Sequence, residues 1–72
     1  MKDFLIGNGF VLYATGCSCH GLPKYYRNNR YPDYRIITKY GYGIIKCNGV
    51  EIFRTNQIDD FKSKMNELKL TN

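Results

Sequence analysis

The most closely spaced residues that could carry chemistry are Cys17, Cys19 and His20, which lie between two glycines. Thiolate and imidazole groups bind Zn²⁺ in structural sites, usually four to one ion. The third cysteine completes such a set, which is Cys17, Cys19, His20 and Cys47. A domain this short would gain folding free energy from a bound metal. The sequence therefore suggests a structural zinc site.

The spacing of these residues leaves a second interpretation open. Cys19 and His20 are adjacent, and neighbours on a strand point to opposite faces, so both could bind one ion only from a tight turn. Cys47 stands alone beside apolar residues and could be a small buried side chain. Buried or unreactive thiols are thus the alternative to zinc.

A catalytic cysteine is not expected from this cluster. A thiol nucleophile needs a base that lowers its pKa and a third group that orients the base. His20 could reach Cys17, but Asp33 is the only acid in the segment 16–33. We therefore expect a protein that binds without catalysing a reaction.

Tyrosine alternates with arginine and lysine in the middle of the chain, where six of the seven tyrosines lie within residues 24–42. Arginine and lysine contact phosphates, and tyrosine rings stack on unpaired bases. The candidate ligand-binding residues are Lys24, Tyr25, Tyr26, Arg27, Arg30, Tyr31, Tyr34, Arg35 and Lys39. These residues predict that a Tyr/Arg-rich loop and the strand after it bind a nucleic acid or a nucleotide.

The same composition supports two other interpretations. Tyrosine and arginine are favoured at protein interfaces, and short chains rich in Asn, Lys and Tyr are typical of phage and mobile-element products. A protein partner, as for an inhibitor of a host-defence protein or an accessory subunit, is therefore the second hypothesis. In the third, the tyrosines fill a small core and keep their hydroxyls at the surface. Homo-oligomerisation also stays open.

The positive charge is confined to the middle of the chain. The net charge is +5, and residues 21–54 hold seven basic and two acidic side chains, which accounts for all of it. The two ends are neutral. We therefore expect the basic surface to form from the middle segment.

The sequence pattern predicts strands, turns and one helix that would position these residues. Together they indicate an α+β fold in one domain, residues 1–72. An Asn-Gly pair between apolar runs favours a type I′ hairpin turn, and the sequence has two, in hairpins over 1–15 and 44–54. Between the two hairpins we expect a loop over 16–33. A β-meander over 34–54 follows the loop and includes the second hairpin. The predicted pairs of the second hairpin are Cys47–Val50, Lys46–Glu51, Ile45–Ile52 and Ile44–Phe53.

The chain is expected to end in a helix over 56–69 that packs on a small antiparallel sheet of four to five strands. Apolar residues recur there at helical spacing, at Ile58, Phe61, Met65 and Leu68. No run approaches the ~18 apolar residues of a membrane span, and the first apolar run is too short for a signal peptide. We therefore expect a cytoplasmic protein with reduced thiols and no membrane partner.

Overall fold

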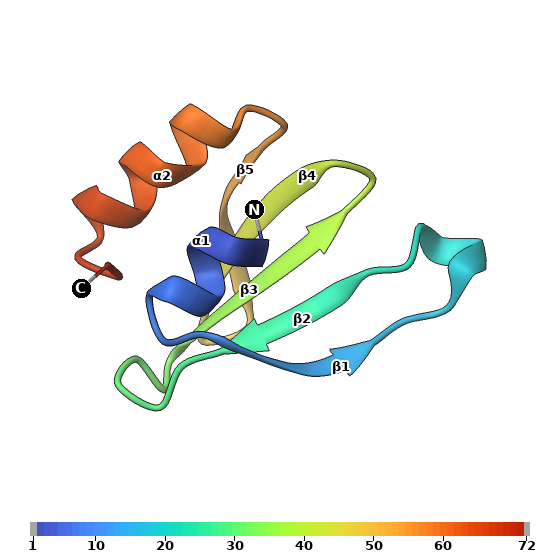
Figure 1. Ribbon diagram of the computed structural model, residues 1–72, viewed down its shortest axis with the longest axis horizontal. Coiled ribbons are helices and arrows are strands. Elements are labelled where there is room, and N and C mark those ends of the chain that lie inside the picture. The colour runs from blue at the N-terminus through green and yellow to red at the C-terminus, as the bar shows by residue number, and fades with distance from the viewer. Residues whose placement is uncertain (1, 72) are drawn as a thin grey trace.

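A computed structural model describes residues 2–71 of the protein. Within this range the chain forms α1 (Lys2–Gly7), β1 (Val11–Thr15), the 3₁₀-helix η1 (Ser18–His20), β2 (Lys24–Arg27), β3 (Tyr34–Lys39), β4 (Tyr42–Cys47), β5 (Val50–Thr55) and α2 (Ile58–Glu67). The strands form one antiparallel sheet in the order β1-β2-β3-β4-β5, so each strand pairs with the next (Figure 1). The predicted α+β fold, with a C-terminal helix on an antiparallel sheet, is confirmed.

The first element is a helix, and the hairpin expected over 1–15 is wrong. The Asn8-Gly9 pair ends α1: the Gly9 N–H donates to the Ile6 carbonyl and the Phe10 N–H to the Leu5 carbonyl, both at 3.0 Å. Gly9 has a φ of 88°, as the Schellman motif requires at this position. A helix end and a type I′ turn both need positive φ, so Asn-Gly alone does not separate them.

The C-terminal helix ends with the same motif at Lys69, whose φ is 59°. The Leu70 N–H donates to the Met65 carbonyl at 2.9 Å, and the side chains of both residues are buried. Of the predicted apolar stripe, Phe61 and Met65 are fully buried, whereas Ile58 remains 38% exposed. The helix spans Ile58–Glu67 and is thus shorter than the predicted 56–69. Its middle turns, which contain Phe61 and Met65, anchor it to the core.

The β-meander over residues 34–55 is built on two tight turns. Tyr40 and Gly41 join β3 to β4, and Asn48 and Gly49 join β4 to β5, all with φ between 51° and 82°. Positive φ at both central residues is the type I′ geometry, whose twist matches that of paired strands. The predicted second hairpin is thereby confirmed.

The register of that hairpin departs from the prediction at a β-bulge. Lys46 pairs with Glu51 as expected, but Ile45 pairs with Phe53, which leaves Ile52 as the extra residue. A bulge moves every later side chain to the opposite face. Phe53 therefore packs against the core, and Arg54 pairs with Ile44.

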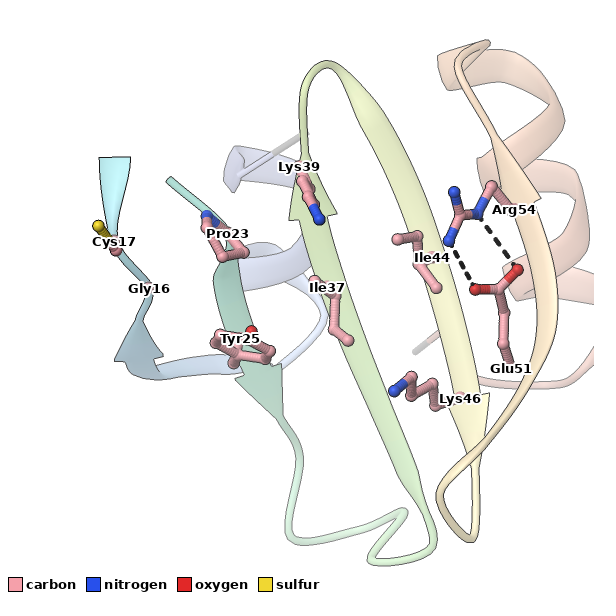
Figure 2. A pocket seen from close by; sticks show the side chains of 10 residues that line it. All are labelled: Gly16, Cys17, Pro23, Tyr25, Ile37, Lys39, Ile44, Lys46, Glu51 and Arg54. Atoms are coloured by element: carbon pink, nitrogen blue, oxygen red, sulfur yellow. Dashed lines mark hydrogen bonds and ion pairs between the residues drawn. The ribbon is translucent and has the colours of Figure 1, made fainter. Parts of the chain in front are cut away.

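The hydrophobic core lies between one face of the sheet and the two helices, which cover it (Figure 1). Tyr26, Ile36 and Ile45 contribute from the sheet, each 1% exposed or less. Alternate residues of the same strands point to the other face, which no described helix covers (Figures 1 and 2). We call this the open face.

The segment 16–33 is not the continuous loop that we expected. It contains η1 and β2, and β2 pairs with both β1 and β3. Asn28, after β2, is 5% exposed. Its Nδ2 donates to the Asn8 carbonyl at 3.0 Å, and its Oδ1 accepts from the Arg30 N–H at 3.0 Å. This amide therefore ties the loop after β2 to the end of α1.

Candidate functional site

The open face contains a groove of about 340 Å³ that crosses strands β2 to β5 (Figure 2). Its floor is apolar, and three cations stand around it. The lining residues are Gly16, Cys17, Pro23, Tyr25, Ile37, Lys39, Ile44, Lys46, Glu51 and Arg54. An apolar floor with a few convergent polar groups is the usual composition of a small-molecule or cofactor site.

The two-residue period of the strands places the groove residues side by side. Ile37 of β3 pairs with Ile44 of β4, and these two isoleucines make the floor (Figure 2). Lys39 follows Ile37 on the same face, and Lys46 follows Ile44, with the β-pleat setting both directions. An ammonium group therefore stands at either end of the apolar floor.

Arg54 and Glu51 form the wall of the groove on β5. The Arg54 Nη2 donates to Glu51 Oε1 at 2.8 Å, and Nε donates to Oε2 at 3.2 Å. These bonds lower the pKa of Glu51 and raise that of Arg54. The pair is largely exposed, so its contribution to stability is small. Its consequence for the site is that the Arg54 charge is already partnered.

A second cationic cluster lies on the open face around Tyr13 of β1. The guanidinium carbons of Arg27 and Arg35 lie 5.4 Å and 5.9 Å from the Tyr13 ring centroid. The Tyr13 and Tyr25 rings are 6.2 Å apart and tilted by 50°. Tyr25 belongs to this cluster and also lines the groove. The two clusters are therefore neighbours on one surface.

The structure divides the residues predicted from sequence between the two sides of the sheet. Tyr25, Arg27, Arg35 and Lys39 lie on the open face, in the groove or around Tyr13. Lys24 is exposed, but its side chain points to the opposite side of the sheet from that of Tyr25. It pairs with Thr38 and lies near the turn at Tyr40. Four of the nine predicted residues thus share one surface.

Three of the predicted tyrosines belong to the core or its margin. Tyr26 is 1% exposed in the middle of the core, so it cannot stack on a ligand, and this part of the prediction is wrong. Tyr31 stacks on Phe10 with ring centroids 6.2 Å apart, and Arg30 lies over Tyr31 at 5.9 Å. Tyr34 packs against the core, and its burial raises the pKa of its hydroxyl.

Tyr13, Lys46 and Arg54 are residues of the site that were not predicted from the sequence. The alternation of Arg35, Ile37 and Lys39 on one strand was a signal for a shared face, and pairing β3 with β4 would have added Lys46. Arg54 had no such signal, since only the bulge at Ile52 turns it to this face. Tyr13 was assigned to the hairpin that does not form.

Of the predicted zinc ligands, Cys47 lies away from Cys17 and Cys19. The segment with Cys17 and Cys19 follows Thr15, which lies at the same end of the sheet as Thr38 and Gly43. Cys47 is four residues further along β4, about 13 Å at the rise of a strand. Among the described side chains, no group of three or more His, Cys, Asp or Glu could hold a metal ion. The side chain of His20 lies outside the described part.

Two exposed cysteines interact at the start of η1: Cys17, the residue before it, and Cys19 within it. The Cys19 N–H donates to the Cys17 Sγ at 3.4 Å, so Cys17 caps the 3₁₀-helix. Hydrogen bonds from the side chain and backbone of Cys19 lower the pKa of the Cys17 thiol. The same contact raises the pKa of Cys19. Cys17 is therefore the more readily ionised of the two thiols.

No protein-family model matches the chain, and no curated protein or solved structure is significantly similar to it. None of the helices within residues 2–71 has the length and apolar character needed to cross a membrane.

Proposed function

We propose that the open face is a binding surface for an anionic ligand that carries both phosphate and nucleobase groups, a nucleic acid or a nucleotide. The observation that carries this proposal is the composition of the face. Its cations are Arg27, Arg35, Lys39, Lys46 and Arg54, and Glu51 is the one acid among the described residues that line the groove. Such a surface attracts phosphate through charge and charge-assisted hydrogen bonds.

The tyrosines and the apolar floor would contact the nucleobases of the ligand. Tyr13 is 44% exposed and Tyr42 is 39% exposed, and Tyr25 lies half-buried between the two cationic clusters. Exposed rings of this kind offer planes on which bases stack, at about 1–3 kcal/mol per base. A purely electrostatic surface would not need them. The ligand is therefore expected to present flat, unpaired bases as well as phosphates.

The acid–base pair on the groove wall provides a test of the proposal. In Glu51→Gln the Arg54 guanidinium loses its anionic partner and becomes available to phosphate. We expect this variant to bind labelled oligothymidylate about threefold to tenfold more tightly at about 50 mM salt. Its log–log salt slope should be more negative than that of the wild type by about 0.7, the value for one added contact to a single strand.

Glu67→Gln is the matched control. Glu67 forms the same i,i+3 pair with Lys64 on α2, away from the open face, so this variant changes the net charge equally. We expect its affinity to stay within about twofold of wild type, because the freed cation is remote from the ligand. Equal gains in both variants, or wild-type binding that does not weaken between about 50 and 200 mM salt, would contradict the proposal.

Edge strand β1 favours a second candidate function, the docking of a protein partner. All five of its residues are exposed and none is charged, and Val11 and Leu12 are 53% and 44% exposed. An edge with these properties can add a strand from another chain. If a protein occupies this edge, Leu12→Lys should weaken its binding and leave oligonucleotide binding unchanged.

A further inference from the structure

The open face has two cationic sites whose separation is fixed by strand β3. The first is the cluster around Tyr13, in which Arg35 pairs with Lys46, and the second is Lys39 at the other end of the groove floor. Arg35 and Lys39 are four residues apart on one strand and point to the same face, with Ile37 between them. At about 3.3 Å per residue, their Cα atoms are about 13 Å apart.

One nucleotide is too short to bridge this separation. Successive nucleotides of a stacked strand advance by about 3.4 Å, so 13 Å corresponds to about four nucleotides, and to fewer in a more extended strand. A mononucleotide can place its phosphate at one of the two cationic sites only. A strand of several nucleotides can place one phosphate at Arg27, Arg35 and Lys46, since Lys46 pairs with Arg35, and another at Lys39.

The surface between the two cationic sites suits unpaired bases. Tyr25 contacts Tyr13 on one side and lines the groove on the other, and the groove floor of Ile37 and Ile44 is only 8% and 5% exposed. A base reaches a recessed floor only if it is turned out of a duplex, because the stacked bases of a helix are enclosed by its backbones. Double-stranded nucleic acid would contact the cations without filling the groove.

We therefore infer that the ligand of the open face is a single-stranded nucleic acid, of which about four nucleotides span the two cationic sites. This inference rests on the proposed function and specifies its ligand. In this arrangement Arg27, Arg35 and Lys46 hold the strand at one end, and Lys39 holds it at the other. The bases between them lie over Tyr13, Tyr25 and the groove.

The experiment is a length series on the full chain at low salt. Thymidine monophosphate and oligothymidylates of increasing length, up to about sixteen nucleotides, compete with a labelled strand of about eight nucleotides, consistent with known site sizes. We expect the affinity to rise at least tenfold from the mononucleotide to about four nucleotides, because a second phosphate site is then engaged. Beyond that length only a shallow rise is expected, and a duplex of equal length should bind more weakly.

One arginine variant and one lysine variant of β2 test whether the cluster around Tyr13 is one of the two phosphate sites. Arg27→Ala removes a cation of the Tyr13 cluster and should abolish most of the gain in affinity with length. Lys24→Ala is the matched control, since Lys24 is an exposed cation of the same strand that points to the opposite side. This variant should keep the wild-type length dependence.

The possible results separate this inference from the proposed function. A mononucleotide that binds as tightly as four nucleotides, with no effect of Arg27→Ala, would overturn the inference and leave nucleotide binding at the groove intact. A duplex that binds as tightly as the single strand would also overturn it. Failure of every nucleotide and oligonucleotide to bind would overturn the proposed function, and the inference with it.

Discussion

Removing the two lysines that frame the groove, in Lys39→Ala/Lys46→Ala, should weaken binding of a single-stranded oligonucleotide about a hundredfold at low salt. The two ammonium groups stand at either end of the apolar floor formed by Ile37 and Ile44. A hydrogen bond to a charged group contributes about 1.5 kcal/mol or more, and each 1.4 kcal/mol changes affinity tenfold. The measurement is fluorescence anisotropy with a labelled oligothymidylate.

Lys62→Ala/Lys69→Ala is the control for total charge. Both lysines are exposed, on α2 and just after it, so the net charge falls by the same amount. This variant should retain affinity within about threefold, because exposed charges beyond a Debye length of about 10 Å are largely screened. A similar loss in both double variants would mean that binding follows net charge, and would refute a site on the open face.

Phe61→Ala should unfold a large part of the protein population. Phe61 is fully buried where α2 meets the sheet, and truncating a buried phenylalanine costs about 3–5 kcal/mol through lost burial and the cavity left behind. A small domain has a total stability near the low end of about 5–15 kcal/mol. Urea denaturation followed by circular dichroism measures the change.

Ile58→Ala on the same helix is the control for this substitution. Ile58 is 38% exposed in the first turn, so its truncation should lower the free energy of unfolding by less than about 1 kcal/mol. If the two variants lose equal stability, α2 is not held to the sheet through Phe61 and the described core is wrong.

Much of the sheet could be predicted from sequence because its turns are local. Asn48-Gly49 joins two apolar strands of alternating pattern, and both residues adopt the positive φ that this pair favours. Asn8-Gly9 has the same two residues between apolar runs, yet it ends a helix. The choice is made by Leu5 and Phe10, which are buried against the sheet and α2, and such long-range packing is not visible in a local pattern.

The candidate site could be predicted in part, for a similar reason. The sequence identified a basic, tyrosine-rich segment, and Tyr25, Arg27, Arg35 and Lys39 do share the open face. The sequence could not show that Tyr25 lies on the open face and Tyr26 in the core, because this depends on which face of β2 the helices cover. It could not place Arg54 either, since a single bulge reverses the direction of that side chain.

Isoleucine methyl NMR during an oligothymidylate titration tests the binding surface most directly. Ile37 and Ile44 form the floor of the groove, whereas their chain neighbours Ile36 and Ile45 lie in the core on the other face. We predict that the methyl signals of Ile37 and Ile44 shift strongly on titration, those of Ile36 and Ile45 shift much less, and that of Ile58 on α2 stays in place. Shifts centred on Ile58, or no shift at Ile37 and Ile44 at saturation, would contradict binding at the open face.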